Sequence, residues 1–84
     1  MTRRIIEIEI SEIHEAVLGI LKRHPSGLSS EKIRYILEGM AIPLTPFQIR
    51  MVLQEMVTLT LIARERRSRS YAYLLIGLQE IEQD

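Results

Sequence analysis

The 84-residue chain contains no cysteine and no tryptophan. The absence of cysteine excludes disulfide bonds and thiolate metal ligands. Long hydrophobic runs are also missing, because no apolar stretch approaches the roughly 20 residues that a transmembrane helix needs. Near the N-terminus, Glu7 and Glu9 interrupt the isoleucines that follow two arginines, which is unlike a signal peptide. We therefore expect a soluble cytoplasmic protein that does not associate with membranes.

The residues that catalytic and metal sites require are scarce. His14 and His24 do not have the i, i+4 spacing of a metal-binding pair, and no carboxylate pattern accompanies them. We place His14 on the polar side of a helix and His24 at the end of that helix, where a cation is favoured. A glycine-rich phosphate loop is absent as well. The sequence thus predicts no enzyme activity, no metal and no cofactor.

The chain has no excess of either charge. Lysine and arginine number 11, as do aspartate and glutamate, so the formal net charge is zero. This balance argues against a strong nucleic-acid binder, because such domains are often clearly basic. The distribution is uneven, however. Arginine clusters around residues 64–69, and acidic residues cluster in the tail at 77–84. A neutral total can therefore hide a positive face and a negative face.

The length of the chain allows one small domain. A domain of this size buries only about 60% of the surface that its unfolded chain exposes. Association of two copies would add buried surface, so we expect a homodimer. We find no internal repeat and no linker between domains.

Two amphipathic helices are predicted in the first half of the chain. Ser11 is a suitable N-cap for a helix over about residues 12–23, and Pro25 with Gly27 ends it. A second helix begins at Ser29 or Ser30. The apolar residues of each helix recur at helical spacing. They are Ile13, Ala16, Val17, Ile20 and Leu21 in the first helix, and Ile33, Ile36, Leu37 and Met40 in the second.

A third helix leads into a hairpin with a basic tip. Thr45 is a good N-cap, and Pro46 suits the first helical position. An apolar stripe follows at Ile49, Val52, Leu53, Met56 and Val57. The period then changes to that of a strand, and residues 67–70 are polar enough to form the turn. One register pairs Arg66 with Tyr71, Arg64 with Tyr73, Ala63 with Leu74 and Leu61 with Ile76. It predicts one apolar face, and one face with arginine beside tyrosine.

Residues 1–10 alternate isoleucine and glutamate, which favours a half-buried strand. This strand has four possible arrangements: it pairs with the hairpin, pairs with a second subunit, covers its own core, or runs into the first helix. Arg3 and Arg4 are candidates for an arm that reaches DNA, with an ordinary solvated terminus as the alternative. Residues 77–84 form either a frayed tail or a short helix.

From about residue 12 to 76 the chain resembles the winged helix-turn-helix superfamily. The matching residues are Ile49, Leu53, Met56, Leu61, Ile62, the run from Arg64 to Arg69, and the run from Tyr71 to Leu74. The resemblance implies an α+β fold: three helices (residues 11–60), a two-stranded wing (61–76) and a short bridging strand at Leu28. An extra N-terminal strand is an option. Thr60 departs from the family, which commonly has glycine at this position because the backbone there tends to be left-handed.

Two functions compete. The first is a DNA-binding regulator of transcription, in which the third helix enters the major groove and the wing contacts phosphates. Its candidate residues are Gln48, Arg50, Gln54, Arg64, Arg66, Arg67, Arg69 and Tyr71. Arginine bonds phosphate and guanine, glutamine reads adenine, and tyrosine stacks on arginine stems. The second is a protein-interaction module without nucleic acid, indicated by Glu55 and by Phe47 and Met51 on the outer side of the third helix.

Overall fold

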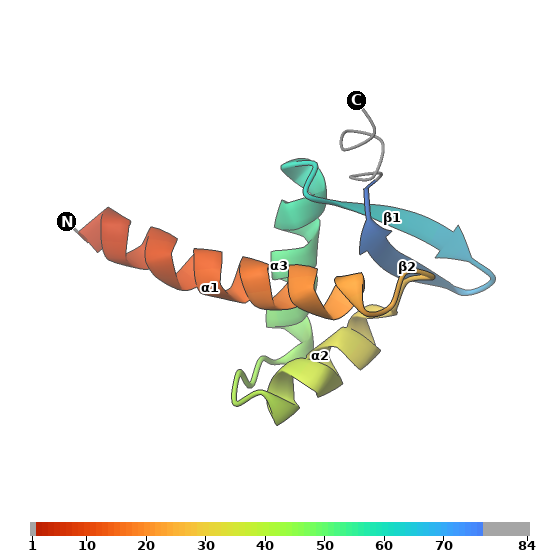
Figure 1. The fold of residues 1–84 in the computed structure, drawn as a ribbon, viewed down its shortest axis with the longest axis horizontal. Coiled ribbons are helices and arrows are strands. Elements are labelled where there is room, and N and C mark those ends of the chain that lie inside the picture. Colours follow the sequence, from red (N-terminus) through yellow and green to blue (C-terminus); the bar gives the residue numbers. More distant parts are fainter. Residues whose placement is uncertain (1, 77–84) are drawn as a thin grey trace.

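The computed structural model describes the backbone of residues 2–76 and the side chains of residues 12–76. It contains three helices followed by an antiparallel hairpin (Figure 1). The helices are α1 (Thr2–Lys22), α2 (Ser30–Gly39) and α3 (Pro46–Thr58), and the strands are β1 (Ile62–Arg67) and β2 (Ser70–Leu75). This arrangement confirms the predicted α+β fold of a helical bundle with a C-terminal hairpin. We call residues 62–75 the wing.

The core forms where the apolar stripes of the three helices meet the base of the wing. Val17 and Leu21 of α1, Ile33 of α2 and Leu53 of α3 are each 0% exposed. All belong to the stripes predicted from helical spacing. A single short amphipathic helix cannot bury its stripe alone, so packing against its neighbours stabilises each of them. The wing closes this core through Ile62, which is 1% exposed.

The N-terminal segment is a helix, and the predicted strand at residues 1–10 is wrong. α1 begins at Thr2 and runs without interruption to Lys22, so Ser11 lies inside it and does not cap it. The alternating pattern misled because Ile6 and Ile10 are also four residues apart, and they continue the helical spacing of Ile13. The segment contains no glycine or proline that would end the helix.

Side chains cap the first turns of α2 and α3. The Ser29 hydroxyl accepts a hydrogen bond from the Lys32 amide at 3.3 Å. At α3 the Thr45 hydroxyl accepts from the Gln48 amide at 3.0 Å, and the Gln48 carbonyl Oε1 accepts from the Thr45 amide at 2.9 Å. This reciprocal pair is a capping box, which satisfies two backbone donors that the helix itself leaves free. The prediction of Thr45 as the N-cap is confirmed, whereas the part that Gln48 plays in the capping box was not predicted.

The C-terminal ends of α2 and α3 have the same geometry. Ala41 and Thr60 follow the last turns with φ of 65° and 59°. In the residue after each of them, the backbone amide bonds back to the helix. The Ile42 amide donates to the Leu37 carbonyl at 2.9 Å, and the Leu61 amide donates to the Met56 carbonyl at 2.8 Å. These are the bonds of a Schellman motif, in which glycine is the usual left-handed residue. Thr60 thus adopts the left-handed backbone that is usual at this position, although the chain has no glycine there.

The wing has the register predicted from the sequence. Arg64 pairs with Tyr73 and Arg66 with Tyr71, and the loop between the strands is Ser68-Arg69. An isolated antiparallel bridge joins Leu28 to Tyr73, with the Tyr73 amide donating to the Leu28 carbonyl at 2.7 Å. The expectation of a short bridging strand at Leu28 is thus confirmed, and it attaches the wing to the segment between α1 and α2.

The two faces of the wing are not sorted as expected. Ile62 and Tyr73, on the face that carries the arginines, are buried at 1% and 7% exposure. Ala63 and Leu74, predicted to form the apolar face, are only half-buried. The reason is tertiary: the base of the arginine face packs on the core, and only its outer half reaches solvent. The pair of Leu61 with Ile76 lies outside the ladder, which begins at Ile62 and Leu75.

Some predictions lie outside the described residues. These are the side chains of Arg3 and Arg4 and the tail at 77–84. Of the helices in the described part of the chain, none is both long enough and apolar enough to span a bilayer.

Candidate nucleic-acid interface

Four of the predicted site residues come together where α3 meets the wing. Arg64 donates through Nη1 to the Oε1 of Gln54 at 3.1 Å, which joins β1 to the outer side of α3. The Cζ of Arg64 lies 4.8 Å from the ring centroid of Tyr71, and the Cζ of Arg66 lies 5.9 Å from it. Both distances suit a cation–π interaction. Tyr71 therefore orients two guanidinium groups on the exposed part of the wing, while Tyr73 is buried and unsuited to this role.

Arg67 is bound to the protein itself. Its Nη2 donates to the carbonyl of Ser26 and to the Oε1 of Glu65, the latter at 2.9 Å. Gly27, the residue after Ser26, has φ of 95° and approaches the wing so closely that an added Cβ would lie 3.3 Å from the Tyr73 carbonyl oxygen. The carbonyl bond attaches the outer half of β1 to the loop after α1. Arg67 is thus better placed to hold the wing than to bind a polyanion.

Arg69 occupies the loop at the tip of the wing, next to Ser68 with φ of 48°. Its side chain is exposed. Among the arginines of the wing, Arg69 extends furthest from the helices, since it lies beyond the last paired residues of the ladder. A charge at this position can reach a phosphate that the helices cannot.

The remaining site residues lie on α3. Gln48 is exposed, but its carbonyl oxygen belongs to the capping box, so only its amide NH₂ remains for a ligand. Arg50 lines a hollow of about 230 Å³ between the first turns of α2 and α3, opposite Arg34. Glu31 also lines this hollow, and its carboxylate offsets part of the positive charge. Arg50 lies one turn before Gln54 of the group around Tyr71, on the side of α3 toward α2.

Two apolar side chains occupy the outward face of α3. Phe47 is 66% exposed and Met51 is 58% exposed. They are four residues apart and so lie on one face of the helix, the face that also presents Gln54. Large apolar groups of this exposure are unusual on a surface that contacts only water. They are suited to thymine methyl groups or to the apolar surface of another protein.

Two cations near this surface escaped the sequence analysis. Arg34 shares the hollow with Arg50, and Lys32 lines a second hollow between α2 and the wing together with Arg67 and Tyr71. Both belong to α2, and the pattern of α2 gives no reason to single them out. Only the packing of α2 beside α3 and the wing places them next to the predicted arginines.

His14 does not lie on a polar face as predicted. It is half-buried, and its Nε2 is buried without a hydrogen-bond partner among the described residues. Within the same part of the chain, no three histidine or acidic residues are grouped in a way that could hold a metal ion.

Comparison of the chain with known protein families, with curated proteins and with solved structures finds no match. The geometry of α3 and the wing is therefore the ground for a functional assignment.

Proposed function

We propose that this protein binds double-stranded DNA through one surface made of α3 and the wing, and that it regulates transcription as a small winged-helix protein. The observation that carries the proposal is the bond from Arg64 to Gln54 together with the stacking of Arg64 and Arg66 on Tyr71. These contacts place oriented cations directly beside the outward face of a helix. A helix in the major groove with adjacent cations on the phosphates is a common way of binding duplex DNA.

The arginines have different tasks under this proposal. Arg66 and Arg69 neutralise phosphates, because both are exposed and neither forms an ion pair with an acidic side chain of the described chain. Arg64 remains bound to Gln54, which keeps the wing at a constant distance from α3. Arg50 lies one turn before Gln54 on the same side of α3, toward α2, and contacts a further phosphate. Because the formal net charge of the whole chain is zero, the rest of the protein surface adds little attraction for DNA.

The salt dependence of binding to a short duplex tests the proposal. For B-DNA the logarithm of the binding constant falls with the logarithm of salt concentration by about 0.9 for each phosphate neutralised. Replacing Arg66 and Arg69 together by alanine should therefore make the slope shallower by about 1.8 and weaken binding on all sequences alike. The matched control replaces both by lysine, which retains the charge and should retain the slope. Absence of any binding at low salt refutes the proposal.

A second function is favoured by Phe47 and Met51, whose exposure suits a protein interface without nucleic acid. Under this alternative duplex DNA does not bind at low salt. Met51→Glu, and not the alanine substitutions in the wing, then abolishes the complex with the partner protein. A complex that survives Met51→Glu rules out this face of α3 as its interface.

A further inference from the structure

The exposed face of α3 has apolar side chains along its centre. Phe47 is 66% exposed and Met51 is 58% exposed. Helical spacing places both nearly opposite the buried side of α3, which Ile49, Leu53 and Met56 form. A helix that enters the major groove with this face brings apolar groups to the edges of the bases.

The two glutamines beside this apolar line offer DNA their donors only. The Oε1 of Gln48 accepts from the Thr45 amide at 2.9 Å, and the Oε1 of Gln54 accepts from Arg64 at 3.1 Å. Both partners are donors without an acceptor, so the oxygen of each side-chain amide must face them. A bidentate contact with adenine needs this oxygen together with the NH₂ group. Reading adenine in this way would disrupt the capping box or the bond that joins α3 to the wing.

Hydrogen-bond donors and apolar groups together match the edge of thymine in the major groove. That edge presents the O4 acceptor and the C5 methyl group. Cytosine presents a donor where thymine has O4, and guanine has acceptors but no methyl group. Glu55 supplies a carboxylate on the exposed side of α3, and it can accept from the amino group of the adenine that pairs with thymine. A thymine–adenine pair therefore matches each kind of group that this face offers.

We propose that α3 recognises duplex DNA through thymine, with Phe47 and Met51 each in contact with the C5 methyl group of one thymine. This inference rests on the proposed function and names the base that the same surface reads. Residues four apart are separated by about 6 Å along a helix, and successive base pairs by about 3.4 Å along the duplex. The two thymines therefore lie within about two base-pair steps of each other.

Deoxyuridine isolates the contribution of the methyl group, because it differs from thymidine only in lacking that group. Selection from a random duplex library first identifies the sequences that the full-length protein prefers, and we expect thymine at both contacted positions. The selected duplex is then made with deoxyuridine at these positions, singly and together. The dissociation constant at fixed salt should rise about fourfold for each methyl group removed, with an unchanged salt slope.

The outcomes separate this inference from the function on which it rests. Selected sequences without the two thymines overturn the inference, and so do equal dissociation constants for the thymidine and deoxyuridine duplexes. Either result leaves the proposed DNA binding in place, because the duplex is still bound. Absence of binding to both duplexes at low salt refutes the inference and the proposed function together.

Alanine substitutions connect the methyl effect to named side chains. Phe47 and Met51 are exposed, so Phe47→Ala and Met51→Ala should retain the helix content that circular dichroism measures. Each variant should lose the preference for thymidine over deoxyuridine at one position. Affinity for the duplex with deoxyuridine at that position should stay within about twofold of the unsubstituted protein. An equal loss of affinity for both duplexes would mean that the side chain contacts no methyl group, and it would overturn the inference.

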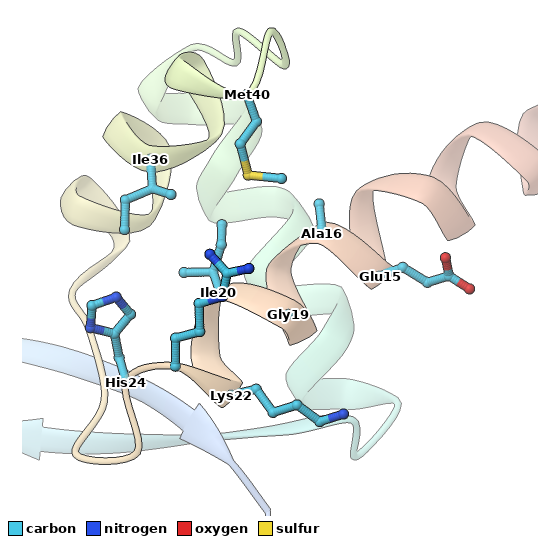
Figure 2. Close-up of a pocket in the computed structure, with 9 residues that line it drawn as sticks. Glu15, Ala16, Gly19, Ile20, Lys22, His24, Ile36 and Met40 are labelled. Carbon is cyan, nitrogen blue, oxygen red and sulfur yellow. The ribbon is translucent and has the colours of Figure 1, made fainter.

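Met40→Ala is the matched control for Met51→Ala. Met40 is 48% exposed, but it lies at the end of α2, at the edge of an apolar groove of about 460 Å³ between α1 and α2 (Figure 2). The residues that line this groove belong to α1, to α2 and to the ends of these two helices. Met40→Ala should therefore leave the preference for thymidine unchanged. Loss of that preference in both methionine variants would contradict a contact specific to α3.

Discussion

Replacing Thr60 by glycine should stabilise the protein, although it removes a side chain. Thr60 follows α3 with φ of 59°, a left-handed conformation that costs an L-residue about 1–2 kcal/mol relative to glycine. The side chain is exposed, so little packing is lost with it. Glycine also gives the unfolded chain more freedom, which costs about 0.4–1 kcal/mol. The difference leaves a net gain of about 0.5–1 kcal/mol in the free energy of unfolding.

The expected gain is measurable as a melting temperature. Domains of this kind unfold with an entropy of about 2.1 cal/mol/K per residue. For the 84-residue chain this amounts to about 0.18 kcal/mol/K. Thr60→Gly should therefore raise Tm by about 3–6 °C, followed by far-UV circular dichroism at constant protein concentration.

Two further substitutions isolate the cause. Ala41→Gly relieves the same conformation at the end of α2, where φ is 65°, and should stabilise by a similar amount. Thr60→Ala keeps the left-handed backbone and a Cβ atom, so it should gain much less than Thr60→Gly. If Thr60→Gly lowers Tm, or if Thr60→Ala raises it equally, left-handed strain at the end of α3 is not the cause and the reasoning fails.

Two other substitutions probe how the site is held. Gly27→Ala should destabilise the protein by about 1–3 kcal/mol, because φ is 95° and the new Cβ would lie 3.3 Å from the Tyr73 carbonyl oxygen. Urea denaturation measures the loss of stability. An unchanged denaturation midpoint contradicts the close approach. Thr45→Ala should cost about 1 kcal/mol through loss of the capping box at α3. The same measurement checks it, with the exposed Thr58→Ala as the comparison, and equal losses for both would argue against a specific cap.

Local features of the fold were predictable from the sequence, and contacts between distant segments were not, except for the bridging strand at Leu28 that the family resemblance implied. The stripe of α3, its cap at Thr45 and the register of the wing depend on spacing within short segments, and all three were predicted. The hydrogen bond from Arg67 to the carbonyl of Ser26 joins residues that are 41 apart in sequence. Nothing about an arginine or a serine at these positions predicts that the two residues meet. The burial of Tyr73 likewise depends on how the wing meets the core. At the N-terminus, the spacing of Ile6 and Ile10 fits a strand and a helix equally well. Only the continuity of α1 through this segment decides between the two structures.

Contacts of the wing with the rest of the fold determine how its cations are presented. The wing is attached at four points: the Schellman motif that ends at Leu61, the bridge from Leu28 to Tyr73, the bond from Arg67 to Ser26, and the bond from Arg64 to Gln54. Because these attachments reach both α3 and the segment after α1, the hairpin cannot rotate about any single one of them. Arginines on a rigid support lose less conformational freedom on binding than free side chains do. Arg64, which is bonded to Gln54, should therefore contribute to a defined binding geometry, whereas Arg69 at the tip adds attraction that depends on salt and is indifferent to sequence.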